Sequence, residues 1–186
     1  MNLIFLIVYS IWLVSEILIN RLFRSGNADQ QNADNNTLQI IWLTIALTMT
    51  LSVFISIYFH FPILRNDWIK YIGLLIIIAG CIFRFVSIIS LGRYFTADVT
   101  IRQGHQLKTT GMYAYLRHPS YTASLLSFIG FGISLNNWLC VLIIAIAMTG
   151  AFSLRIKAEE KVLTTQFGEE YTDYKKKTFG LVPFIL

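Results

Sequence analysis

The sequence predicts an all-α integral membrane protein that crosses the bilayer with five transmembrane helices. A cytoplasmic flap is expected before the fourth helix, and an amphipathic helix at the C-terminal end. Two observations on composition predict this class: 55% of the 186 residues are hydrophobic, and only 13% are charged. Soluble domains have about one quarter charged residues. The third observation is that the apolar residues gather in runs long enough to span ~30 Å of hydrocarbon as helices.

The first three spans occupy residues 1–90. Their apolar runs are Leu3–Ile19, Leu38–Phe61 and Ile69–Leu91, separated by a polar, Asn-rich loop at 21–36 and a short connection at 65–67. The first run has no basic segment before it and no small-residue cleavage pattern, so we expect a retained helix and not a signal peptide. Pro62 closes the second run, because the residue before a proline disfavours helix.

Two ionisable residues, Glu16 and Arg84, fall inside these spans. A charge in the hydrocarbon region is costly unless it is paired or reaches the interface. Two explanations for Arg84 stay open. Either its long side chain extends to the inner end of its helix, or it pairs with Glu16.

The two remaining spans are Tyr121–Leu135 and Trp138–Leu154. Only two asparagines separate them, so they must form an antiparallel helical hairpin. The fourth span carries a stripe of small residues, Ala123, Ser127, Gly130 and Ser134. In lipid such a stripe lets helices approach closely, so we interpret it as a packing surface.

Beyond the last span, apolar and aromatic residues recur at three- and four-residue steps. These residues are Ile156, Leu163, Phe167, Tyr171 and Tyr174. The spacing predicts an amphipathic helix that leaves the fifth span and lies at the cytoplasmic surface. Arg155 and Glu159 are four residues apart and share one helix face, where spacing alone favours a weak surface ion pair.

The basic residues predict the orientation. If the N-terminus lies outside, twelve of the fifteen Lys and Arg residues lie on the cytoplasmic side: Arg21, Arg24, Arg93, Arg102, Lys108, Arg117, Arg155, Lys157, Lys161 and Lys175–Lys177. Only Arg65 and Lys70 lie outside. Cytoplasmic loops of membrane proteins carry an excess of positive charge, so we expect an external N-terminus and a cytoplasmic C-terminus.

The sequence gives no sign of a metal site or of nucleic-acid binding. Cys81 and Cys140 fall inside apolar runs and are interpreted as small buried hydrophobes. His60, His105 and His118 have no ligand-like spacing, so no metal is expected. The net charge of +5 is attributed to topology and to contact with anionic lipid headgroups.

Residues 111–121 are the stretch around which the chain is organised. Here a basic segment meets the start of an apolar run. Arg117 and His118 mark a membrane–water boundary, and Pro119 suits the first turn of a helix. The N–H groups of that helix start, together with the cation, the imidazole and the neighbouring tyrosines, indicate a binding site.

The preceding segment, Tyr94–Lys108, is less regular. It has either the shape of a short hairpin around Gly104-His105 or that of an irregular flap. Such backbone is tolerated only at the aqueous face or against other protein. The residues alone favour an ordinary surface loop.

Three ordered motifs in this half carry a resemblance to a known family. They are Gly111-x-Tyr113-x-x-x-Arg117-His118-Pro119-x-Tyr121, then Arg155-Ile156-x-x-Glu159-Glu160-x-x-Leu163, then Phe167-Gly168-x-x-Tyr171-x-x-Tyr174 with a closing Val182-Pro183. Their order and spacing resemble the isoprenylcysteine carboxyl methyltransferase family over residues 91–186. The resemblance implies one membrane domain over residues 1–186, in which residues 91–186 form the cofactor-binding and catalytic part.

The resemblance further implies an S-adenosyl-L-methionine-dependent carboxyl O-methyltransferase, which acts on a prenylated cysteine or a similar lipophilic acid within the membrane. The cofactor-binding residues carried over by position are His105, Gln106, Leu107, Lys108, Tyr113, His118, Pro119, Ser120, Tyr121 and Glu159. Arg155 is the catalytic and substrate-binding candidate, which faces the acceptor. The flap is then expected to close over the cofactor.

Three alternatives stay open at this point. A phospholipid N-methyltransferase would use the same cofactor with an amine acceptor. A sterol-type NADPH reductase shares an Arg-His-Pro-x-Tyr element, although the paired Glu159-Glu160 fits a cationic cofactor better. A non-enzymatic membrane scaffold leaves the clustered polar residues unexplained.

Overall fold

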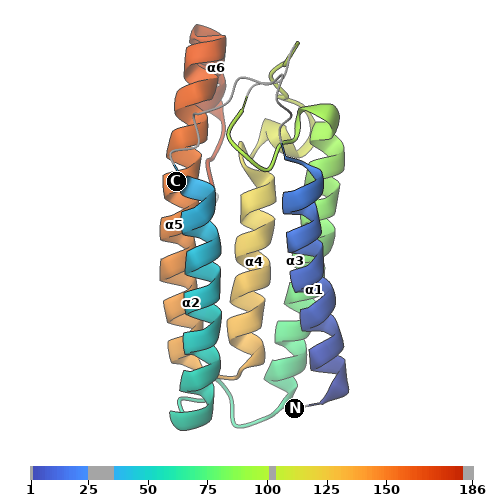
Figure 1. Cartoon of the computed structure of the whole chain (residues 1–186), viewed down its shortest axis with the longest axis vertical. Coiled ribbons are helices and arrows are strands. Elements are labelled where there is room, and N and C mark those ends of the chain that lie inside the picture. Colours follow the sequence, from blue (N-terminus) through green and yellow to red (C-terminus); the bar gives the residue numbers. More distant parts are fainter. Residues whose placement is uncertain (1, 25–35, 101–103, 182–186) are drawn as a thin grey trace.

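The computed structural model describes residues 2–24, 36–100 and 104–181. In these ranges the protein is helical, without strands, and forms an elongated bundle (Figure 1). The helices are α1 (Leu3–Leu22), α2 (Thr37–Tyr58), α3 (Trp68–Leu91), α4 (Pro119–Ser134), α5 (Trp138–Phe167) and α6 (Glu169–Lys177), with the 3₁₀ turns η1 (Gly92–Tyr94) and η2 (Gly111–Ala114). Most of the first polar loop and the closing Val182-Pro183 lie outside the described residues.

Four of the described helices are long and apolar enough to cross a membrane: α1, α2, α3 and α5. The predicted fourth span, α4, has 16 residues and a length of ~24 Å, which is short for the hydrocarbon core. Eleven of its 16 residues are buried, so the other helices surround it. α4 is therefore the inner helix of an integral membrane bundle.

The small-residue stripe on α4 packs against α3, as its composition predicts. A Cβ added to Gly80 would lie 2.2 Å from Ser127 Oγ, and one added to Gly73 would lie 2.3 Å from Ser134 N. A Cβ on Gly130 would in turn meet the Gly73 carbonyl oxygen at 2.9 Å. These glycines leave no room for a side chain, and the two backbones come into close contact.

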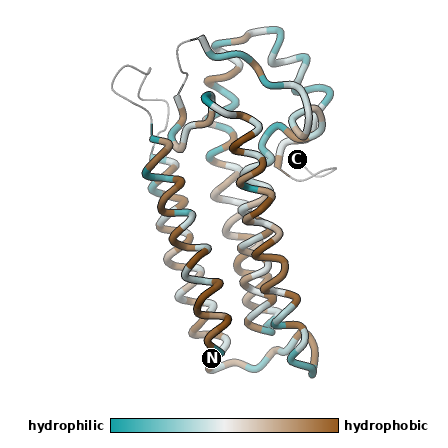
Figure 2. The backbone as a smooth tube through the Cα atoms, turned by 90° about the vertical axis from the view of Figure 1, so that its right-hand side faces the viewer, coloured by the Kyte–Doolittle hydropathy of each residue, from teal (hydrophilic) through white to brown (hydrophobic). Residues whose placement is uncertain are grey.

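The core lies where α1, α4 and α5 meet. The rings of Trp12 and Phe128 pack edge to face at 4.9 Å, and Phe152 and Met148 of α5 complete the same cluster. Leu181, from the C-terminal segment, is buried in it as well. Many apolar side chains on the outer helix faces are exposed, which suits contact with lipid. Figure 2 shows hydrophobic helices below and a hydrophilic end above them.

The turn between α4 and α5 confirms the predicted hairpin. Asn136 takes a left-handed conformation with φ of 49°. Asn137 caps α5, because its Oδ1 accepts a hydrogen bond from Leu139 N at 3.0 Å. The Asn137 amide also donates to Phe59 O at 2.7 Å, which ties the end of α2 to this turn.

A helix leaves the fifth predicted span, as the spacing of the apolar residues beyond it indicates. α5 continues without a break past Leu154 to Phe167. Nothing in the sequence around Leu154 breaks a helix, whereas Gly168 takes a φ of 56° and ends it. The predicted amphipathic helix is thus divided between the extension of α5 and the short α6, whose Tyr171 and Tyr174 are buried.

Candidate active site

A pocket opens at the hydrophilic end of the bundle. It is formed by the end of α3 and the flap after it, by η2 and the start of α4, and by the extension of α5 and α6. Residues 94–96 and 98–100 line one wall, and Val162 and Leu163 of α5 line another. The described parts of the flap are irregular and form no ladder, and its residues 101–103 lie outside the described ranges.

The start of α4 has the structure that its sequence predicts. Pro119 is its first residue, and the His118 carbonyl accepts hydrogen bonds from Tyr121 N and Thr122 N at 3.1 and 3.2 Å. The C-terminal segment passes alongside this turn. Arg117 N donates to Phe179 O at 2.8 Å, and Thr122 Oγ1 donates to a main-chain oxygen of the same segment. The C-terminal segment therefore holds the backbone around His118 in place.

His118 lies between two carboxylates. Its side chain is buried, with Nδ1 3.8 Å from Glu159 Oε2 and Nε2 3.4 Å from Glu160 Oε1. The ring stacks on Tyr121 with a centroid distance of 5.7 Å. Nε2 is shielded from solvent and faces the Glu160 carboxylate.

The two adjacent glutamates have different surroundings. Glu160 accepts a hydrogen bond from Arg117 Nε at 2.8 Å and another from Lys175 Nζ. Its charge is thus balanced within the protein. Glu159 lines the pocket, and 33% of its side chain is exposed. Of the pair, Glu159 is the carboxylate that a bound cation can reach.

Tyr121 connects Glu159 to Arg155. Its hydroxyl donates to Glu159 Oε2 at 2.9 Å and accepts a hydrogen bond from Arg155 Nε at 3.2 Å. Arg155 is only 1% exposed, so it is a buried group and not the surface residue that spacing alone favours. Its other nitrogens donate to Thr37 Oγ1 at 2.9 Å and to Ala97 O at 2.6 Å.

Arg155 also lines a second pocket, which shares Tyr121 and Ser120 with the first. α2 supplies four apolar side chains to its wall, and α4 and α5 add Phe128 and Phe152. Glu16 and Arg84 lie in the same wall and pair at 2.9 Å, which decides between the two explanations for Arg84. Arg84 also donates to both Ser120 oxygens at 3.1 Å.

Of the ten predicted cofactor-binding residues, nine line the first pocket: His105, Leu107, Lys108, Tyr113, His118, Pro119, Ser120, Tyr121 and Glu159. Gln106 does not line it and is exposed, so its side chain is not placed as expected. The pocket also has lining residues that were given no role from the sequence, among them Tyr94, Tyr171 and Tyr174. Tyr171 and Tyr174 belong to the third motif, and that motif is the feature of the sequence from which their place in the site could have been predicted.

Burial explains the state of the pocket tyrosines. It raises the pKa of Tyr113, of Tyr171 and of Tyr174 above that of a free phenol. All three hydroxyls therefore stay neutral at physiological pH and keep their protons for donation.

Comparison with known proteins gives three results. Residues 72–165 match the model of the isoprenylcysteine carboxyl methyltransferase family. The chain is 37% identical to protein-S-isoprenylcysteine O-methyltransferase B of Arabidopsis thaliana over 145 residues, 75% of this chain and 74% of the relative. It is also 38% identical to the Rattus norvegicus protein-S-isoprenylcysteine O-methyltransferase over 120 residues, 63% of this chain and 42% of the relative.

The chain belongs to the isoprenylcysteine carboxyl methyltransferase family.

A solved structure extends this family likeness to the N-terminal helices. The eukaryotic intramembrane Ras methyltransferase of the family superposes with a TM-score of 0.71 and 28% identity. The match covers 96% of this chain and 64% of the other. From the sequence, residues 1–90 resembled the family only as membrane spans. The superposition shows that they belong to the family fold, and the family is one of carboxyl O-methyltransferases.

Proposed function

We propose that the protein transfers a methyl group from S-adenosyl-L-methionine to the carboxylate of a prenylated cysteine or a similar lipid-like acid. The observation that supports this most directly is that two adjacent pockets share Tyr121, with Glu159 in the wall of one and Arg155 in the wall of the other. A cationic donor would match the negative charge of Glu159, and an anionic, lipophilic acceptor would match the positive charge of Arg155.

The first pocket fits the donor. Glu159 offers a carboxylate to the donor's ammonium group, and the faces of Tyr113 and Tyr121 suit a sulfonium. The N–H groups at the start of α4, beside the imidazole of His118, suit the donor's carboxylate. When bound, S-adenosyl-L-methionine supplies an electrophilic methyl group.

The second pocket fits the acceptor. A carboxylate is already ionised at pH 7, so the site needs no general base. Arg155 would orient it with two parallel hydrogen bonds, in place of the neutral oxygens of Thr37 and Ala97 that it now contacts. Hydrogen bonds between ions are the stronger ones, so this exchange is favourable. Arg84, paired with Glu16, is a second guanidinium in the same pocket.

The packing of the helices suggests how a lipid chain enters. α1 packs on α3 and α2 packs on α5, and α4 is visible between α1 and α2 in Figure 1. Side chains of both α1 and α2 line the second pocket. The prenyl group would therefore enter sideways from the bilayer, between these two helices.

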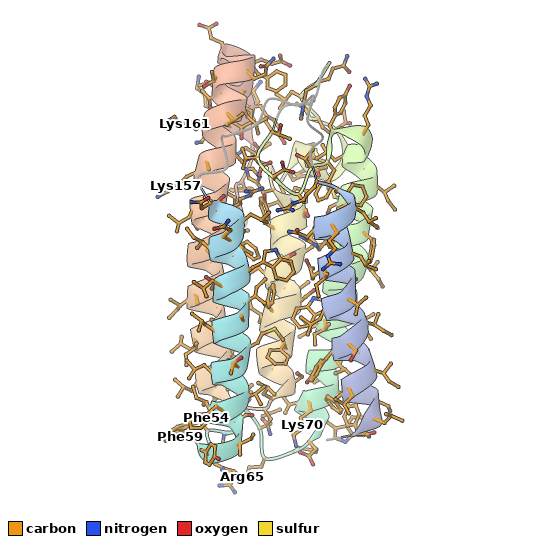
Figure 3. All side chains as sticks on the ribbon, in the orientation of Figure 1. Phe54, Phe59, Arg65, Lys70, Lys157 and Lys161 are labelled. Atoms are coloured by element: carbon orange, nitrogen blue, oxygen red, sulfur yellow. The ribbon has the colours of Figure 1, made fainter. Side chains whose placement is uncertain are left out.

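The orientation proposed from the sequence also fits the placement of the basic residues. Lys157 and Lys161 lie at the pocket end of the bundle, and Arg65 and Lys70 at the opposite end (Figure 3). If α4 crosses the membrane together with α1, α2, α3 and α5, the chain has five spans, and the N-terminus would be external and the active site cytoplasmic. The flap, whose Ala97 bonds to both Phe23 O and Arg155, would then cover the donor from the aqueous side.

The test compares two acceptors with a labelled methyl donor: S-farnesylcysteine, a carboxylate, and phosphatidylethanolamine, an amine. We expect methylation of the carboxylate, and a sharp loss of it in Arg155→Lys, which keeps the charge but loses the planar fork. Lys157→Arg, an exposed change on the same helix, is the control and should have no effect. Methylation of the amine lipid alone, unaffected by Arg155→Lys, would favour a phospholipid N-methyltransferase instead.

A further inference from the structure

The two buried tyrosines of α6, Tyr171 and Tyr174, use their hydroxyls differently. Both side chains line the donor pocket, and their rings pack edge to face at a centroid distance of 6.0 Å. The Tyr174 hydroxyl donates a hydrogen bond to Tyr113 O at 2.6 Å. The Tyr171 hydroxyl is shielded from solvent and has no hydrogen-bond partner among the residues that the structure describes.

A buried hydroxyl without a partner is unfavourable, because folding removes its bonds to water and returns none. Phenylalanine would fill the same space without this cost. The carboxylates of Glu160 and Glu159 act on this hydroxyl through their charge, but neither accepts a hydrogen bond from it. The hydroxyl therefore stabilises nothing within the described fold. The residue is nevertheless almost fully buried, at 1% exposed, and it lies in the wall of a pocket.

We propose that Tyr171 is a further binding residue of this pocket, and that its hydroxyl donates a hydrogen bond to an acceptor atom of the bound methyl donor. This inference rests on the proposed function. It gives a binding role to the tyrosine after Phe167-Gly168, where the φ of Gly168 turns α6 so that Tyr171 lies against the pocket. The hydroxyl stays protonated, because burial raises the pKa of Tyr171.

The structure offers a matched pair of variants, Tyr171→Phe and Tyr174→Phe, which each remove one oxygen from the same short helix. S-adenosylhomocysteine is the probe, and its Kd is measured by calorimetry on the purified full chain. The melting temperature of each variant is measured without ligand. For Tyr171→Phe we expect binding weaker by roughly two- to tenfold, the range for a neutral hydrogen bond. The melting temperature should be unchanged or higher, because an unpaired hydroxyl is removed.

Tyr174→Phe should behave in the opposite way, with a lower melting temperature and a smaller change in Kd, because its hydroxyl bonds within the fold. An unchanged Kd in Tyr171→Phe would overturn the assignment, and so would a fall in its melting temperature equal to that of Tyr174→Phe. If the wild-type chain itself fails to bind S-adenosylhomocysteine, the proposed function is overturned as well. Normal wild-type binding with an unaffected Tyr171→Phe overturns the tyrosine assignment alone.

Discussion

Replacing Glu159 by glutamine removes one charge from the donor pocket with little change in shape. Glu159 accepts a hydrogen bond from Tyr121 and is the partly exposed member of the glutamate pair. Glutamine can still accept from that hydroxyl, so the fold should persist. In the proposed site, the lost interaction is a charge-assisted hydrogen bond to the donor's ammonium, worth roughly 1.5–3 kcal/mol. The Kd for S-adenosyl-L-methionine should therefore rise by roughly ten- to 150-fold.

Calorimetric titration of the purified protein measures this change. Glu170→Gln removes an equal charge from an exposed position on α6 and should leave the Kd unaltered. His118→Ala should also weaken binding, because it removes a polar ring that lines the pocket beside Glu159. Unchanged affinity in both Glu159→Gln and His118→Ala would show that the donor does not bind here.

Three further predictions concern stability and topology. Glu160→Gln should lower the melting temperature, because it removes the negative charge that balances the buried Arg117 and the nearby Lys175; a change below 1 °C would contradict this. Gly80→Val should prevent close packing of α3 on α4 and lower the yield of folded protein. Gly150→Ala, with no atom within 4 Å of the added Cβ, should not, and equal behaviour of the two variants would refute the packing argument. A cysteine at Lys176 should react only with thiol reagents applied from the cytoplasmic side, and one at Arg65 only with reagents applied from outside. The reverse pattern would show that the predicted orientation is wrong.

Much of the fold follows from local sequence. Apolar runs locate the spans because the hydrocarbon thickness dictates their length, and the small residues of α4 indicate close packing because nothing else suits such a stripe. The spacing of apolar residues after Leu154 predicted a helix that continues beyond the fifth span, but not its division at Gly168. There the backbone takes a positive φ, which ends α5 before α6 begins.

The site could be predicted only as far as its motifs extend. Arg117 and Glu160 are 43 residues apart, and no local pattern shows that they pair or that this leaves Glu159 free for a ligand. The burial of Arg155 is equally a product of tertiary contacts, with Thr37 lying 118 residues away. Gln106 lies next to pocket-lining residues in sequence but is exposed, because an irregular segment has no fixed alternation of its side chains.

The most direct test of the central claim is the chemical nature of the methylated product. S-farnesylcysteine and methyl-labelled S-adenosyl-L-methionine are incubated with the purified chain in lipid, and the product is then treated with base. A methyl ester releases its label as volatile methanol, whereas a methylated amine does not. The proposed chemistry predicts label in the farnesylated product that base releases quantitatively and that is absent in Arg155→Lys. Label that resists base, or a chain that binds the donor but never labels the carboxylate, would contradict it.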